Sequence, residues 1–128
     1  MSQATGEWPT RRQTVEQERA AYALACIRQV KGTRAAGEYR REVMGLPAMV
    51  LVNGLGQTLA FLKAKKKLVA SEPLSQGVRV RLGFQGDLLD EVTRMDVATY
   101  RLAQLEALAV LGWLKRFAEA ELPEPEGS

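Results

Sequence analysis

Four lysines stand close together near the middle of the chain, at Lys63, Lys65, Lys66 and Lys67. From residue 63 to residue 81 there are six basic residues and one acidic residue, which gives this stretch a local charge of +5. Clustered lysines bind polyanions such as RNA or DNA, because each ammonium group neutralises phosphate charge without reading a base. The same cluster would also suit an acidic protein face, or it would be a solvated helix end and loop.

A second basic pair, Lys115 and Arg116, lies in an apolar segment near the C-terminus. Both groups of cations follow residues that we expect to be buried, so a rigid scaffold would hold their positions. Basic side chains held in this way can follow a phosphate backbone. Four glutamates come soon after the second pair, so the end of the chain has the opposite charge.

Little in this chain suits catalysis. It has no histidine, so it lacks the usual general base near neutral pH and the commonest ligand of transition metals. Asp87, Asp90 and Glu91 could hold a divalent cation, but an acidic first helical turn explains them equally well, because the helix dipole favours negative charge there. We predict no catalytic set, no metal site and no cofactor, and we do not expect a metal-dependent nuclease built on these carboxylates.

Gly54 and Gly56 lie in an apolar segment that ends in lysine. They lack the Gly-Lys-Ser/Thr ending of a phosphate-binding loop, and no strand is expected before them as in a dinucleotide site. These glycines either break their helix into two pieces or let a neighbouring backbone approach closely. Of the two, we favour close packing, with a mild bend of the helix. Trp113 and Phe117 have rings that can stack on bases, but their helical spacing in an apolar segment favours a place in the core.

The sequence predicts a first helix that begins at Thr14 and stops near Gly32. Thr14 and Gln17 have the spacing of a capping box, in which each side chain accepts a hydrogen bond from the other residue's amide. A second helix is expected over residues 35–45, and Pro47 fits the first turn of a third, where a missing amide does no harm. That third helix is apolar nearly all round, so we expect it at the centre of the protein.

Residues 68–86 are expected to form an irregular basic loop, because their alternating apolar part is short and has no strand partner. Asp87 is expected to cap a short helix, and Asp96 the last helix, over residues 97–122. Together these elements predict an all-α fold, a compact irregular bundle of about five to six helices in a single domain over residues 14–122.

Chain length and cysteine content set further bounds. With 128 residues the chain is expected to form one domain, flanked by a flexible leader over residues 1–13 and a flexible tail over residues 123–128. Cys26 is the only cysteine, which excludes an internal disulfide framework and fits a reducing cytoplasm. No apolar run approaches ~20 residues, so no transmembrane helix is expected, and the polar N-terminus lacks the apolar core of a secretion signal.

Three parts of the chain resemble those of one known family. Residues 16–24 (EQERAAYAL) resemble its opening helix, and Tyr39, followed by residues 46–49 (LPAM) and 53–62 (NGLGQTLAFL), resembles its central motif. Residues 106–122, with EALA and WLKRFAEAEL, resemble its C-terminal motif. On these residues the chain is similar to the small subunit of the type III-B CRISPR effector, the Cmr RNA-silencing complex.

The resemblance implies an all-α protein without chemistry of its own, in a cytoplasmic ribonucleoprotein of antiviral defence. Copies of it would stack head to tail along the backbone subunit that holds the guide RNA, in one particle with the large subunit, and a free copy can be monomeric. Their basic face would line the path of the target RNA. Cleavage would belong to the backbone subunits, and cyclic-oligonucleotide signalling to the large subunit.

Two functions of different classes follow. In the first, the chain binds guide and target RNA through phosphate contacts. The candidate RNA-binding residues are Lys63, Lys65, Lys66, Lys67, Lys115, Arg116, Arg40, Arg41, Arg11 and Arg12. In the second, the chain is a helical adaptor that binds only protein, and its basic face meets an acidic partner.

Overall fold

The computed structural model describes residues 13–124, and this part of the chain consists of six helices without a strand. The helices are α1 (Val15–Val30), α2 (Ala36–Asn53), α3 (Leu55–Ala64), α4 (Leu68–Leu82), α5 (Leu88–Val92) and α6 (Val97–Glu121). The predicted all-α fold is therefore confirmed. Most of the predicted leader and tail lies outside the described residues.

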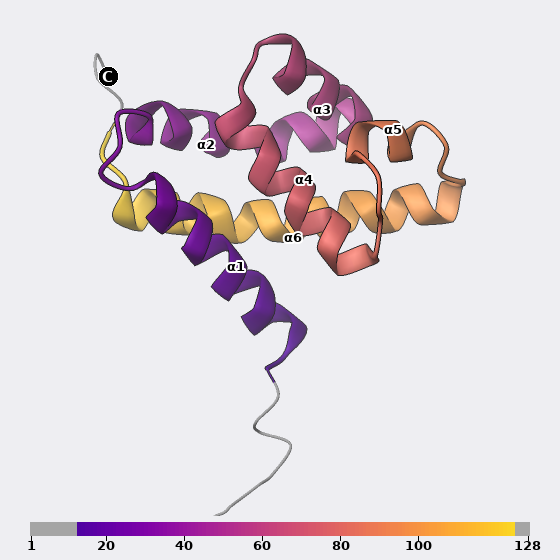
Figure 1. Ribbon diagram of the computed structural model, residues 1–128, viewed down its shortest axis with the longest axis horizontal. Helices are drawn as coiled ribbons and strands as arrows, with labels where there is room; N and C mark the ends of the chain where they lie inside the picture. Colours follow the sequence, from indigo (N-terminus) through magenta and orange to yellow (C-terminus); the bar gives the residue numbers. More distant parts are fainter. Residues whose placement is uncertain (1–12, 125–128) are drawn as a thin grey trace, which may run out of the picture.

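The longest helix, α6, extends along the molecule, and α1, α2 and α4 each pack against it (Figure 1). Its buried apolar residues recur at helical spacing: Ala103, Ala107, Val110, Leu111, Leu114 and Ala118. The alanines among them let neighbouring helices approach α6 closely. The short helix α3 contacts α2, α4 and α5, so it closes the bundle on the side away from α1.

Side-chain caps fix where three helices begin, as the sequence predicts. In the capping box of α1, the Gln17 amide donates to Thr14 Oγ1 at 3.1 Å, and the Thr14 amide donates to Gln17 Oε1 at 2.8 Å. Asp87 caps α5 through its side chain. Asp96 caps α6, because its Oδ1 accepts a hydrogen bond from the Thr99 amide at 2.8 Å.

Helix α2 continues through Pro47, so the predicted division into two helices at this residue is wrong. A proline inside a helix removes one backbone hydrogen bond and strains the preceding turn. Four side chains on one face of α2 are buried before and after the proline: Tyr39, Val43, Leu46 and Val50. Because burying each of these large side chains contributes about 1.5–3 kcal/mol, their packing outweighs the cost of the proline.

The chain breaks instead at Gly54, whose backbone angles of φ 88° and ψ 160° are accessible to glycine almost alone. The next residues approach α6 closely. The Leu55 amide donates to Gln104 Oε1 at 3.0 Å, and the Gly56 amide donates to Tyr100 Oη at 2.9 Å. The close approach at these glycines is therefore to side chains of α6 rather than to its backbone. Of the two alternatives, the break into two helices is the one observed, and the favoured mild bend is wrong.

The prediction of a loop over residues 68–86 is also wrong, because most of this segment forms α4. Ala70, Leu74 and Val78 are buried at a spacing of four residues, which is a helical period. The alternating apolar residues near its end favour a strand, in which Val78 and Val80 would lie on the same face. In the structure, however, Val78 is fully buried while Val80 is 69% exposed. Packing against the rest of the bundle therefore decides the conformation of a segment whose local pattern is ambiguous.

Several apolar side chains are exposed, which corrects the expected central position of the segment after Pro47. On α2, Leu51 is 68% exposed and Val52 is 80% exposed. On α6, Leu102 and Leu105 are 58% and 57% exposed. The end of α2 is apolar nearly all round, but only one of its faces is covered by the described part of the chain.

Arg19 of α1 and Glu106 of α6 form a partly buried ion pair that joins the first and last helices. Arg19 Nη2 and Nε donate to the two carboxylate oxygens of Glu106 at 2.6 and 2.9 Å. Glu106 is only 5% exposed, and the Arg19 side chain is 20% exposed. The hydrogen bonds with Glu106 raise the pKa of the Arg19 guanidinium. Beside this pair, Trp113 Nε1 of α6 donates to Glu16 Oε1 of α1 at 2.7 Å.

We expect Gly54→Ala to destabilise the protein by about 1–3 kcal/mol, because alanine rarely adopts this backbone conformation and its Cβ would lie 3.2 Å from Tyr100 Oη. The matched control is Gly45→Ala inside α2, where no neighbouring atom lies within 4 Å of an added Cβ. That change should stabilise the protein by about 0.5–1 kcal/mol. Urea unfolding followed by circular dichroism measures both, and effects of the same sign would contradict the role of Gly54.

We expect Arg19→Met to destabilise the protein by about 2–4 kcal/mol, because it leaves the Glu106 carboxylate buried without a partner. The double variant Arg19→Met, Glu106→Leu removes both charges and should recover most of this loss. Arg28→Met is the control, since it breaks an exposed ion pair with Glu121 and such pairs contribute little. Urea unfolding of the four proteins tests the pair, and an unchanged midpoint for Arg19→Met would refute it.

Candidate nucleic-acid interface

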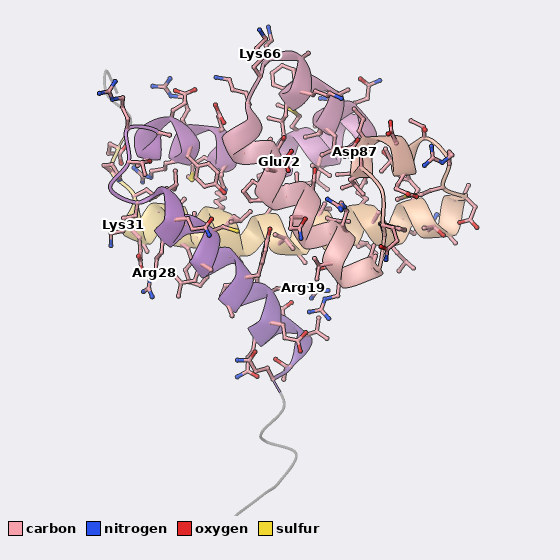
Figure 2. All side chains as sticks on the ribbon, in the orientation of Figure 1. Arg19, Arg28, Lys31, Lys66, Glu72 and Asp87 are labelled. Carbon is pink, nitrogen blue, oxygen red and sulfur yellow. The ribbon has the colours of Figure 1, made fainter. Side chains whose placement is uncertain are left out.

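The end of α3 and the turn that follows it carry three exposed lysines, Lys63, Lys65 and Lys66, which we call the lysine turn. Within residues 13–124, no carboxylate forms an ion pair with these three ammonium groups. Figure 2 shows Lys66 at the edge of the molecule, pointing away from the helices. The turn therefore presents three uncompensated positive charges to solvent.

Backbone hydrogen bonds fix the conformation of the lysine turn. The Lys67 amide donates to the Leu62 carbonyl at 2.8 Å, and the Lys66 amide donates to the Lys63 carbonyl at 3.0 Å. This is the Schellman arrangement of a helix C-terminus, which requires one residue in the left-handed conformation. That residue is Lys66, with φ 58°, and no other described residue besides glycine has a positive φ. Glycine adopts this conformation at much lower cost, so lysine at this position adds a conformational cost to the turn.

Lys67, the fourth candidate lysine, is engaged within the protein. Its Nζ lies 3.0 Å from a carboxylate oxygen of Glu38 and 3.0 Å from one of Glu42, both on α2. The hydrogen bonds that Lys67 donates to these glutamates raise the pKa of its ammonium group. Its own hydrogen bond lowers the pKa of Glu38, while burial raises the pKa of Glu42. Lys67 therefore joins the start of α4 to α2 and is less available to a ligand than its three neighbours.

Of the other predicted RNA-binding residues, three of the four that the structure describes are also paired. Arg40 lies 2.6 Å from a carboxylate oxygen of Glu124, and Arg41 lies 3.4 Å from one of Glu38. Arg116 on α6 lies 3.7 Å from Glu119 Oε1. Lys115, which is half-buried, has no ion-pair partner in the described part of the chain. Arg11 and Arg12 lie outside the described residues.

The structure thus divides the predicted residues into separate groups. Glu38 joins Arg41 of α2 to Lys67, which adjoins the lysine turn. Among the described residues, no hydrogen bond or ion pair links Lys115 or Arg116 of α6 to this group. The lysine turn is therefore the part of the predicted site whose charges are both grouped and free.

Phe61 is a feature of the turn that the sequence analysis missed. It lies on α3, one turn before Lys65, and is 42% exposed. The Lys65 ammonium lies 6.0 Å from the centre of the Phe61 ring. The signal that could have revealed this exposure is that Phe61 falls outside the helical series of buried residues, which runs from Leu55 to Leu62.

The other candidates for chemistry serve structural roles. Trp113 and Phe117 stack on each other at 5.5 Å between ring centres, and both are partly buried against the core, as predicted. Asp87 caps α5, and Glu91 lies 3.7 Å from Arg94. No group of three or more acidic or cysteine side chains suited to a metal ion occurs within residues 13–124. No helix of this part of the chain is long and apolar enough to cross a membrane.

Comparison with known proteins agrees with the family suggested by the motifs. The model of the family described as CRISPR-associated protein (Cas_Cmr5) matches residues 15–121. Two proteins named CRISPR system Cmr subunit Cmr5 are similar to this chain. That of Thermotoga maritima is 31% identical over 112 residues, covering 85% of this chain and 85% of that protein. That of Thermus thermophilus is 31% identical over 107 residues, covering 82% of this chain and 93% of that protein.

A solved structure gives the same result for the fold. The crystal structure of a CRISPR-associated Cmr5 family protein from Thermus thermophilus superposes with a TM-score of 0.74 at 30% sequence identity. The superposition covers 87% of this chain and 100% of that one.

We expect Lys66→Gly to stabilise the isolated protein by about 0.5–1 kcal/mol, because glycine relieves the left-handed backbone at this position. Lys65→Gly is the matched control: Lys65 has φ −87°, so glycine there should destabilise by a similar amount through the entropy of the unfolded chain. Thermal and urea unfolding measure both variants. Destabilisation by Lys66→Gly would contradict a conformational cost at Lys66.

Proposed function

This chain belongs to the CRISPR-associated Cmr5 family, and we propose that it is a non-catalytic small subunit of a type III-B CRISPR effector, the Cmr complex, in which the lysine turn contacts RNA. In this proposal the chain stacks along the backbone subunit with further copies of itself. The lysine turn then lies along the path of the guide and target RNA, where it neutralises phosphates.

One observation carries the RNA contact: Lys63, Lys65 and Lys66 are exposed on a hydrogen-bonded turn without ion-pair partners among the described residues. Positive charges without partners attract a polyanion more strongly than charges already neutralised within the protein. Phosphate contacts made from such a turn are independent of base sequence. A subunit that repeats along an RNA of any sequence needs this kind of contact.

One feature of the composition and one of the structure support a non-catalytic role. The chain has no histidine, so the commonest general base and metal ligand is missing. Asp87, which belongs to the acidic group considered as a metal site, caps α5 through its side chain. The proposed role requires only binding, which is what a positively charged turn on a rigid bundle can do.

A second candidate function, a protein adaptor without RNA contact, is favoured by the exposed apolar side chains of α2 and α6. The exposed residues of α2 are Leu51 and Val52, and those of α6 are Leu102 and Leu105. The two helices are joined nearby, because the Leu55 amide, just after the end of α2, donates a hydrogen bond to Gln104 of α6. Exposed apolar side chains on two neighbouring helices suit contact with another subunit. Ultraviolet crosslinking of the assembled complex separates the two functions, because RNA adducts on this chain would exclude a pure adaptor.

We expect the triple variant Lys63→Ala, Lys65→Ala, Lys66→Ala to weaken binding of this chain to RNA by about tenfold at low salt, uniformly across sequences. If three phosphate contacts are lost, the slope of log affinity against log salt concentration falls by about 2 for a single strand. Fluorescence anisotropy with labelled RNA at several salt concentrations measures both quantities, for the free protein and for the assembled complex.

The matched control removes the same charge elsewhere: Arg28→Ala, Lys31→Ala, Arg34→Ala. Arg28 and Lys31 form ion pairs with Glu121 and lie at a different edge of the molecule from Lys66 (Figure 2). This variant should leave the salt slope nearly unchanged. An equal loss of RNA binding in both triple variants would show that only net charge matters and would overturn the assignment to the lysine turn.

A further inference from the structure

Phe61 is the only aromatic side chain of residues 13–124 that is exposed. The buried positions of α3 are Leu55, Thr58, Leu59 and Leu62. Phe61 lies outside this packed face, so the fold does not require an aromatic ring at its position. A single exposed apolar residue is ordinary on a protein surface, and its neighbours therefore decide whether it has a function.

Those neighbours are the residues of the lysine turn. Lys65 follows Phe61 by four residues, which places both side chains on one helix face, and the Lys65 amide donates to the Phe61 carbonyl at 3.0 Å. The Lys65 ammonium lies 6.0 Å from the ring centre. A cation–π contact at that distance and in solvent is weak, so a stacking group can displace the ammonium from the ring at little cost.

A ring beside free lysines is the combination that holds single-stranded nucleic acid. Proteins of this kind bind the backbone with basic groups, while successive unpaired bases stack on aromatic side chains. Bases inside a duplex are already stacked on one another and cannot reach a ring on a protein surface, although their phosphates stay accessible. Lysines alone do not distinguish the two forms of RNA, whereas an exposed ring next to them favours the single strand.

We propose that Phe61 and the lysine turn form a binding site for single-stranded RNA, with one unpaired base stacked on the Phe61 ring and the adjoining phosphates on Lys63, Lys65 and Lys66. This inference rests on the proposed RNA contact of the lysine turn and adds the form of RNA that the site selects. Because every base has a π face, the site tolerates any sequence.

The test measures the affinity of the full-length protein for labelled oligouridine, either alone or paired with oligoadenosine, at several salt concentrations. Phe61→Leu keeps an apolar side chain but removes the ring. It should weaken single-strand binding at least about fivefold, which is roughly 1 kcal/mol at 25 °C. The loss should be the same at every salt concentration, because no phosphate contact is removed, and duplex binding should not change.

Two further variants serve as controls. Phe61→Trp keeps a stacking surface and should retain the affinity of the original protein for the single strand. Leu51→Ala removes an apolar side chain that is 68% exposed at the end of α2 and should leave RNA binding unchanged. Thermal unfolding of each variant verifies that it is folded, and Phe61→Trp provides a second folded protein if Phe61→Leu is unstable.

The outcomes separate this inference from the proposed function. Undiminished single-strand binding by Phe61→Leu, or an equal loss for single strand and duplex, would overturn base stacking. If the triple lysine variant still lost affinity and salt dependence, the RNA contact of the turn would stand. If Phe61→Leu weakened only assembly with other subunits, Phe61 would be a protein contact and the stacking site would be refuted. RNA binding unaffected by both sets of variants would overturn the two proposals together.

Discussion

Three long helices must bury their apolar faces on the same partner, α6, and the rest of the structure depends on this constraint. α1, α2 and α4 all contact it. Small residues such as Ala103, Ala107 and Ala118 make room for them on its surface. At one position the fit is polar, where Arg19 of α1 reaches Glu106. Because the Glu106 carboxylate is buried, the pair contributes more to fixing how α1 lies on α6 than an exposed pair would.

Anchoring α2 and α4 on one helix also determines where the candidate site lies. α3 connects these two helices, and its first turn is held against α6 by the hydrogen bond from the Gly56 amide to Tyr100. At its other end, Lys67 is held by Glu38 and Glu42 of α2. The backbone of the lysine turn is thus fixed on both sides before a ligand binds. Binding therefore does not cost the conformational entropy of ordering this backbone.

Features that depend on neighbouring residues were predictable from the sequence, and features that depend on distant partners were not. The caps at Thr14 and Asp96 follow from side chains within three residues, so local chemistry is sufficient to place them. The helical conformation at Pro47 and in α4, in contrast, depends on distant residues. In both cases a locally unfavourable helix is stabilised by burial against residues far away in the sequence. The local signs of α4 were the spacing of Ala70, Leu74 and Val78 and the glycine at its end, Gly83.

The candidate site also combines features set by neighbouring residues with features set by distant partners. The position of the lysines can be seen in the sequence. The neutralisation of Lys67 cannot, because its partner Glu38 is 29 residues away. Lys66 then has to be explained, because it occupies the left-handed position of the turn where glycine would be more stable. Glycine there would preserve the Schellman hydrogen bonds and lose one of the three free charges. A lysine that adds conformational cost without forming an ion pair within the described bundle supports the proposed RNA contact of the lysine turn. Phe61, exposed beside it, leads to the same conclusion by a different route, because packing does not require that ring either.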